Sequence, residues 1–173
     1  MEIWDLYTKD RIKTNETIRR GEKIGKDVYR LVVHVCLFNN QGELLIQQRQ
    51  SFKRSWSNKW DLTVGGSALT GETSQMAAGR ETYEEIGYSL SLNEMRPTLT
   101  IHFDEGFDDI YLVQQDLNIE DLNLQEEEVQ AVKWASKEEI LLMIEEDSFI
   151  PYQKSLIELL FFMRQTGEIY TRS

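Results

Sequence analysis

The stretch from residue 65 to 88 constrains this chain more than any other. It reads GGSALTGETSQMAAGRETYEEIGY and follows a short apolar run. Its second half is typical of a helix that carries Glu81, Glu84 and Glu85. Because helical residues three or four positions apart share a face, these carboxylates are expected to lie side by side. Like charges at this spacing repel one another, so the pattern favours a bound divalent cation over a bare acidic face.

The two ends of this stretch carry turn and cap signals. Thr73 is a suitable N-cap for the helix, and Gly87 is a suitable residue to end it. Before the helix, we expect a short strand over residues 61–64. Gly65 and Gly66 are then predicted to turn the backbone sharply and to bring it close to a ligand.

The remaining patterns predict an α/β fold. Strands are indicated over residues 2–7, 31–38, 43–48, 99–103, 110–114 and 129–134. The first strand and a return near residues 17–20 would form an amino-terminal hairpin lying on the main sheet. Residues 104–109 are expected to form an acidic turn. Ser136 is predicted to cap a helix that runs to about residue 146, and Pro151 to open a helix that ends at Gly167. Its apolar stripe comprises Tyr152, Leu156, Leu159, Leu160 and Met163.

Composition narrows the class of protein. The 173 residues, 40% of them hydrophobic, suit one domain over residues 1–173, with 1–28 as an extension. The net charge of −11 argues against nucleic-acid binding, which needs a basic surface. Neither a membrane span nor a signal peptide is indicated, so we expect a cytoplasmic location and no membrane partner. Cys36 and His34 both lie in an apolar run, which is typical of a buried thiol and a hydrogen-bonded core histidine.

A basic cluster precedes the glycines. Arg49, Lys53 and Arg54 lie in a segment that also contains Trp56 and Trp60. In so acidic a chain, these cations are candidates for binding phosphate oxygens, Arg49 most of all. The alternative is a solvated loop that the two tryptophans anchor to the core.

The stretch from 65 to 88 also resembles the signature of the Nudix hydrolases, G-x5-E-x7-R-E-U-x-E-E-x-G-U, in which U is apolar. The fixed positions are filled by Gly66, Glu72, Arg80, Glu81, Glu84, Glu85 and Gly87. Thr82 and Tyr88 depart from the pattern at two apolar positions. The resemblance implies an α/β/α sandwich with a mixed sheet.

The resemblance also assigns roles. It implies that Glu81, Glu84 and Glu85 bind Mg²⁺, with Mn²⁺ as a substitute, and that the Gly65 carbonyl is a further ligand. One of these glutamates, or a loop carboxylate, would polarise the attacking water. Glu126, Glu127 and Glu128 are the loop candidates, although a solvated acidic turn is the favoured interpretation for any single one of them. Arg80 would orient a neighbouring carboxylate, and Glu72 would hold the loop to the helix.

The frame from about residue 4 to 87 is similar to the Nudix branch that contains isopentenyl-diphosphate isomerase. That isomerase has a catalytic cysteine where this chain has Gly65, and histidines where it has Arg30 and Ser67. Isomerisation therefore lacks its proton donor and its metal ligands. Arg49 and Lys53 match the isomerase's diphosphate-binding pair, which supports a diphosphate ligand.

We therefore expect Mg²⁺-dependent hydrolysis of a small-molecule diphosphate linked to another moiety, most simply a nucleoside. Two alternatives stay open, namely an isomerase and a Nudix domain that binds a diphosphate without turnover. Trp56, Trp60 and Phe107 are expected to be core residues, as aromatics in this fold more often are, and stacking of one of them on a base is the alternative. The amino-terminal strand and the final helix are candidate contributors to a homodimer.

Overall fold

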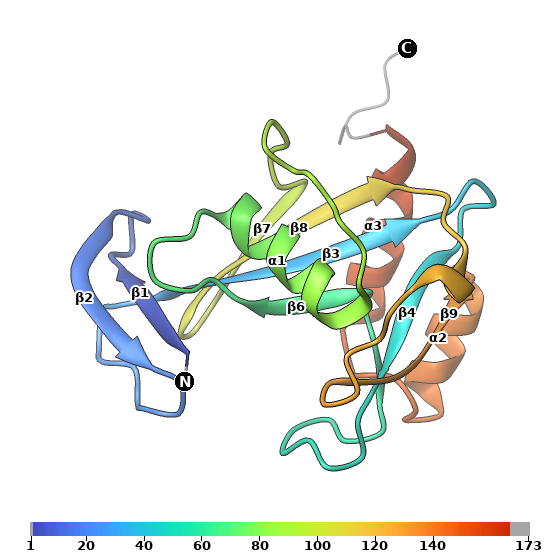
Figure 1. The fold of residues 1–173 in the computed structure, drawn as a ribbon, viewed down its shortest axis with the longest axis horizontal. Helices are drawn as coiled ribbons and strands as arrows, with labels where there is room; N and C mark the ends of the chain where they lie inside the picture. The colour runs from blue at the N-terminus through green and yellow to red at the C-terminus, as the bar shows by residue number, and fades with distance from the viewer. Residues whose placement is uncertain (1, 167–173) are drawn as a thin grey trace.

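The fold is organised around strand β3 (Arg30–Phe38), which lies at the centre of a seven-stranded sheet (Figure 1). The computed structural model describes residues 2–166. Along one edge, β3 pairs in parallel with β8 (Gly106–Gln114) over its whole length. Its other edge is shared, because β6 (Val64–Ser67) pairs with its first half and β4 (Leu44–Arg49) joins it only at Phe38. The outer strands are β5 (Trp60–Asp61), β7 (Leu99–Phe103) and β9 (Val129–Ala135).

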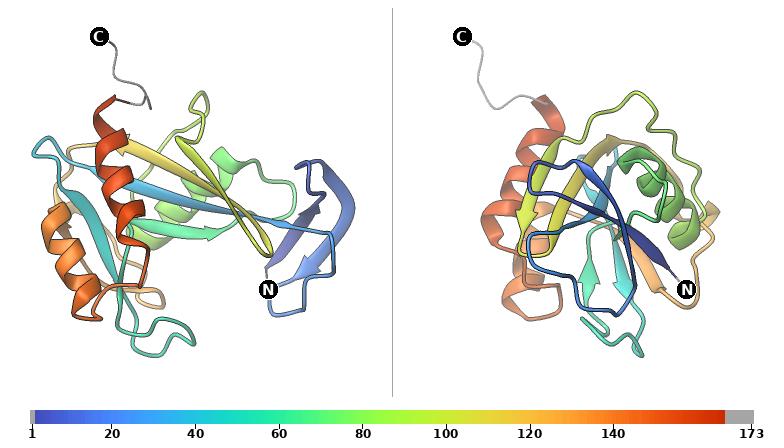
Figure 2. Two further views of the ribbon diagram at one scale, coloured as in Figure 1. Left: turned by 180° about the vertical axis from the view of Figure 1, so that it is seen from behind. Right: turned by 90° about the vertical axis from the view of Figure 1, so that its left-hand side faces the viewer.

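Helices cover both faces of this sheet (Figure 2). Helix α1 (Ser74–Ile86) packs on one face, and α2 (Lys137–Glu145) and α3 (Lys154–Thr166) pack on the other. Side chains of β3 alternate between the two cores, with Val35 in the core under α1 and Cys36 in the core under α2 and α3. The predicted α/β/α sandwich with a mixed sheet is therefore confirmed. Within residues 2–166, no helix is long and apolar enough to cross a bilayer.

The amino-terminal segment forms its own two-stranded sheet. Strands β1 (Ile3–Tyr7) and β2 (Lys13–Arg19) are antiparallel, as the predicted hairpin requires, and enclose a small core that contains Trp4, Leu6 and Ile18. Two backbone hydrogen bonds of 2.7 and 2.9 Å between Tyr7 and Tyr29 join it to the start of β3. The hairpin therefore stands at one end of the main sheet, as Figures 1 and 2 show.

Gly65 and Gly66 lie within strand β6, so the predicted turn at these glycines was wrong. They pair with His34 and Val33 of β3, and the strand expected over residues 61–64 is divided between β5 and β6. Crowding explains the glycines instead. A Cβ atom on Gly65 would lie 2.6 Å from the His34 ring, and one on Gly66 would lie 2.1 Å from the Glu81 carboxylate. Each missing side chain leaves room for a functional or core side chain.

The acidic turn predicted over residues 104–109 is also wrong, because β8 begins at Gly106 and only Asp104 and Glu105 connect it to β7. Asp108 and Asp109 belong to the strand. Each is stabilised there by a cationic partner, since Asp108 accepts from His34 Nδ1 at 2.8 Å and Asp109 pairs with Arg11 of the hairpin connection. The predictions that His34 is hydrogen-bonded and that Cys36 is buried are confirmed.

The last helix begins at Lys154, three residues after the predicted Pro151. Residues 151–153 precede the helix in an irregular conformation, in which the Tyr152 amide donates to the Ile150 carbonyl at 2.7 Å. Of the predicted stripe, Leu160 and Met163 are buried, whereas Leu159 is 39% exposed. The predicted end at Gly167 falls outside the described residues. Helix α2 and its Ser136 cap are confirmed, with the Glu139 amide donating to the Ser136 hydroxyl at 3.2 Å.

Candidate active site

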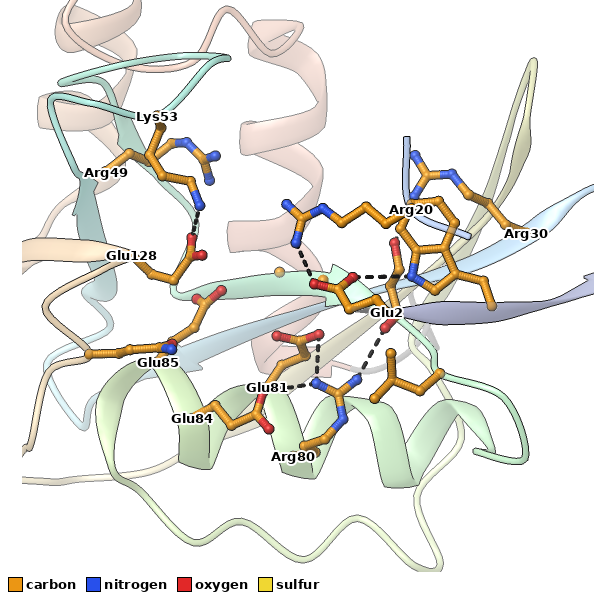
Figure 3. Close-up of a pocket in the computed structure, with 16 residues that line it drawn as sticks. Glu2, Arg20, Arg30, Arg49, Lys53, Arg80, Glu81, Glu84, Glu85 and Glu128 are labelled. Carbon is orange, nitrogen blue, oxygen red and sulfur yellow. Dashed lines mark hydrogen bonds and ion pairs between the residues drawn. The ribbon is translucent and has the colours of Figure 1, made fainter. Parts of the chain in front are cut away.

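A cavity of about 450 Å³ opens between helix α1, strand β6 and the amino-terminal hairpin (Figure 3). The carboxyl end of β4 and the loop before β9 complete its wall. Its lining combines residues that are far apart in the sequence, from Glu2 to Glu128. The cavity is the place where most of the residues predicted for the site come together.

Helix α1 presents its acidic face to this cavity. The Thr73 hydroxyl accepts from the Met76 amide at 3.2 Å, and Gly87 ends the helix in the left-handed conformation with φ of 70°, so both predicted caps are confirmed. Between these caps, the expected spacing places three carboxylates along the cavity, those of Glu81, Glu84 and Glu85.

Arg80 forms a network with the acidic residues around it. Its Nε and Nη2 atoms donate to Glu72 at 2.7 and 3.0 Å, and Nη1 lies 2.9 Å from Glu81 and 3.0 Å from Glu84. A further bond of 3.1 Å reaches the Ser67 carbonyl at the end of β6. Glu72 in turn accepts from the Leu69 amide at 2.8 Å, which ties the loop to the helix. The guanidinium thus fixes the helix to the strand and loop that precede it.

Glu85 is the most buried of the three carboxylates, with 6% of its surface exposed. Its hydrogen-bond partner is the Gln47 amide, which donates at 2.8 Å. Burial, followed by repulsion from Glu81, raises the pKa of Glu85 to about 8. Burial also raises the pKa of Glu81 to about 7, although Arg80 opposes that shift. Two neighbouring carboxylates that lack water to stabilise their charge favour a bound cation.

Oxygen donors of this kind suit Mg²⁺, which prefers hard ligands and keeps several waters. As the side chains stand between residues 2 and 166, no three His, Cys, Asp or Glu groups are gathered closely enough to hold a metal ion. Arg80 accounts for this arrangement, because it draws Glu81 and Glu84 toward itself. The oxygen donors are of the chemical kind that the ion requires, and Glu81 and Glu84 would have to turn toward Glu85 to bind it together. Gly65 lines the same cavity.

Two cations from the β4 end lie opposite these carboxylates. Arg49 and Lys53 line the cavity, as the basic cluster predicted, whereas Arg54 does not. Lys53 pairs with Glu128, and Arg49 Nη1 lies 3.7 Å from Asp61. The Arg49 Nε atom is buried without a hydrogen-bond partner among the described residues. Arg49 therefore retains donor capacity for a ligand.

The loop glutamates are distinguished by position. Glu128 lines the cavity, whereas Glu126 and Glu127 are exposed and do not.

The aromatic candidates for stacking on a base lie outside the cavity. Phe107 is buried in the main core, so the core placement is the correct one for this residue. Trp56 and Trp60 are not among the residues that line the cavity.

Comparison with known proteins places this geometry in a family. The family model for the NUDIX domain matches residues 28–159. The chain belongs to the Nudix family. A Nudix hydrolase of Listeria monocytogenes, lmo0368, is 47% identical over 152 residues, which cover 88% of this chain and 90% of that protein. The crystal structure of DR0079 from Deinococcus radiodurans, at 24% identity, covers 92% of this chain and 97% of that chain with a TM-score of 0.73, which shows the fold. The chain is a Nudix hydrolase.

The comparison with known proteins also finds a partial similarity to isopentenyl-diphosphate isomerases. An isopentenyl-diphosphate Delta-isomerase of Streptomyces avermitilis is 38% identical over 84 residues, which cover 49% of this chain and 42% of that protein. In this Nudix hydrolase, however, the His34 ring occupies the space that a side chain at Gly65 would need. The thiol of Cys36 is buried in the opposite core, and burial raises its pKa far above the usual value. The chain therefore presents no thiol to the cavity.

Sequence reasoning missed the contribution of the hairpin. Glu2, Trp4 and Arg20 line the cavity of this Nudix hydrolase, together with Arg30 at the start of β3. In the sequence, Arg30 stands out only as a position where the isomerase has histidine. The alternation over residues 2–7 indicated a strand, but no local signal showed that its side chains would face α1. This wall depends on long-range packing, which short patterns do not encode.

Proposed function

We propose that this Nudix hydrolase cleaves a small-molecule diphosphate linked to another moiety, with a nucleoside as the favoured moiety, in a reaction that requires Mg²⁺ or Mn²⁺. The observation that carries the proposal is the arrangement of charge in one cavity. Glu81, Glu84 and Glu85 lie on one side, and Arg49 and Lys53 on the other. A diphosphate bridged by a divalent cation has the charge pattern that matches both sides.

The chain's own residues would bind and orient the substrate. Arg49 offers a buried Nε donor without a partner, and its planar group suits two oxygens of one phosphate. Lys53 contributes a point charge once it exchanges Glu128 for a phosphate oxygen. Together these two cations hold the diphosphate against the acidic helix. This placement is the main contribution that a protein makes to phosphoryl transfer.

The metal site would be formed by the carboxylates of Glu81, Glu84 and Glu85, with the Gly65 carbonyl beside them. When bound, the ion neutralises phosphate charge and lowers the pKa of a coordinated water. Arg80 holds Glu81 and Glu84 in the metal-free arrangement, and the two carboxylates would turn from it toward Glu85 when the ion binds. A carboxylate at the cavity then accepts the proton of the attacking water. Glu128, on the loop before β9, is one residue positioned for that task.

The proposal is tested by measuring phosphate or nucleotide release from a substrate panel with and without Mg²⁺. The panel contains nucleoside diphosphates and triphosphates, nucleotide sugars, dinucleotides and isopentenyl diphosphate. We expect metal-dependent release from one class, and loss of most turnover in Glu85→Gln with the fold retained. The matched control is Glu94→Gln, an exposed carboxylate outside the cavity. Unchanged turnover in Glu85→Gln would contradict the metal site, and ligand-induced stabilisation without release would favour a binding domain.

A further inference from the structure

Arg30 is a half-buried cation with no carboxylate of its own. Within residues 2–166, no Asp or Glu oxygen lies within ion-pair distance of its guanidinium, although the chain carries a net charge of −11. Its Nη1 atom donates to the Ser67 hydroxyl at 2.7 Å. Its Nε atom is buried and has no hydrogen-bond partner among the described residues. The guanidinium therefore has a positive charge without an ion-pair partner and N–H donors without acceptors among the described residues.

Two aromatic rings hold the guanidinium plane. The Arg30 Cζ atom lies 4.9 Å from the centroid of the Trp4 ring and 5.5 Å from that of Phe103. Trp4 belongs to the amino-terminal hairpin and Phe103 to β7, so two separate elements fix the side chain. Contacts of this kind cover the flat faces of the group and leave its edge to form hydrogen bonds. An edge of N–H donors is the geometry that binds a phosphate or a carboxylate.

At this end of the cavity, Arg30 is a cation without an ion-pair partner among residues 2–166. Arg20 is nearby, but it pairs with Glu2, and Glu2 also accepts from the Trp4 indole at 3.2 Å. Glu105, Asp108 and Glu2 attract Arg30 only at longer range, and Arg20 repels it. Burial is the largest influence and lowers the pKa of Arg30, although an arginine still keeps its charge.

Arg30 also lies apart from the two cations assigned to the diphosphate. Figure 3 shows Lys53 and Arg49 at one end of the cavity and Arg30 at the other, with Arg20 and Glu2 between them and the acidic helix below. A ligand that used all of these groups would need an anionic group beyond the diphosphate. We propose that Arg30, held by Trp4, Phe103 and Ser67, forms a second oxyanion subsite that selects diphosphates whose attached moiety carries its own phosphate or carboxylate.

This inference rests on the proposed function, and its test distinguishes failure of the subsite from failure of the proposed hydrolysis. Hydrolysis is measured for two pairs of compounds that differ in one anionic group. Coenzyme A and dephospho-coenzyme A differ in a phosphate, and UDP-glucuronic acid and UDP-glucose differ in a carboxylate. We expect the chain to prefer the more anionic member of at least one pair by about tenfold or more in kcat/KM, mainly through KM. The pair that shows the preference identifies the oxyanion.

Arg30→Gln should abolish that preference and leave kcat/KM for the less anionic member within about threefold, because only the extra oxyanion loses a partner. Arg19→Gln is the matched control, since it removes the same charge from an exposed position of the amino-terminal hairpin, outside the cavity. Circular dichroism and thermal melting check that the variants fold. If Arg30→Gln does not fold, Ser67→Ala, which removes the Nη1 partner of Arg30, should reduce the preference by about threefold to tenfold.

The inference is overturned if the unaltered chain treats both members of each pair alike, or if Arg30→Gln weakens both members equally. If no compound is hydrolysed, calorimetric binding of the same four compounds decides. Tighter binding of the more anionic member, lost in Arg30→Gln, would support the subsite although the proposed hydrolysis had failed. Equal binding, or none, would overturn the subsite as well.

Discussion

The Glu81 carboxylate occupies the space that a side chain at position 66 would need, since a Cβ atom built on Gly66 would lie 2.1 Å from Glu81 Oε1. The contact joins the strand β6 to the acidic helix. Gly66→Ala should therefore fold, because the end of a flexible side chain is able to move, but it should displace Glu81 from the cavity. We expect kcat to fall by about tenfold or more, as for other misplaced catalytic groups. Steady-state kinetics and a melting curve measure the two effects.

The matched control for this variant is Gly25→Ala, where the added Cβ would meet only Val28 at an ordinary 3.4 Å. It should retain both activity and stability. Full activity in Gly66→Ala would show that the position of Glu81 does not limit the reaction.

Arg80→Lys should reduce both stability and turnover. A lysine has a single charged nitrogen and cannot reproduce bonds to Glu72, Glu81 and Glu84 at once. Loss of hydrogen bonds to charged partners is expected to cost about 1–3 kcal/mol in the free energy of unfolding. Denaturant unfolding measures this cost, with the exposed Arg19→Lys as control. A variant that unfolds normally but turns over slowly would place the role of Arg80 in orienting carboxylates, whereas normal turnover would contradict that role.

Metal binding should stabilise the protein more at high pH than at low pH. The pKa values of Glu81 and Glu85 rise from 4.5 to about 7 and about 8 on folding. The folded chain therefore binds more protons than the unfolded chain across this range, so metal-free stability falls as pH rises from about 5 to about 8. A divalent cation replaces those protons and offsets the loss. Tm measured with Mg²⁺ and with a chelator should diverge as pH rises.

The Glu81→Gln/Glu85→Gln double variant supplies the control for this pH dependence, because it keeps the side-chain shapes but does not ionise. Its Tm should show a weaker decline with pH and little response to Mg²⁺. A Mg²⁺-induced shift that is equal at about pH 5 and about pH 8 would place the metal on other residues.

Glu128 should matter for turnover, whereas Glu127 should not. Glu128 lines the cavity and pairs with Lys53, while Glu127 is exposed outside it. If Glu128 accepts the proton of the attacking water, Glu128→Gln should lower kcat by about 100-fold or more and leave KM nearly unchanged. Glu127→Gln should match the unaltered chain. A change in KM alone would instead assign Glu128 to holding Lys53.

The parts of the fold that short patterns encode were predictable from the sequence. Helix α1 was correct at both ends because Thr73 and Gly87 act within one turn of it. The parallel pairing of β3 and β8, which joins residues more than seventy positions apart, has no local signature. The two glycines of β6 illustrate the same limit. The glycine pair indicated a turn. The structure instead requires glycine at both positions because His34 and Glu81, from other elements, occupy the space that a side chain would need.

The residues of the candidate site also fall into two groups, those that the sequence predicted and those that depend on long-range packing. The acidic helix and the pair Arg49 and Lys53 were found from spacing and resemblance, and the structure brings them to one cavity. The hairpin wall was not found, since its role depends on how a separate sheet packs against the start of β3. Asp108 and Asp109 were assigned to a turn because their partners, His34 and Arg11, are distant in the sequence.

The amino-terminal hairpin lies outside the residues 28–159 that match the NUDIX model, yet Trp4 of β1 and Arg20, which follows β2, line the cavity. It has its own small core and joins the main sheet at the Tyr7 and Tyr29 bridge. Changes in the hairpin can therefore alter one wall of the cavity without touching the carboxylates of α1. In evolutionary terms, a wall of the cavity supplied from outside the matched family region can diverge while the acidic helix stays the same, so grafting a relative's hairpin would test how far the hairpin sets the substrate range.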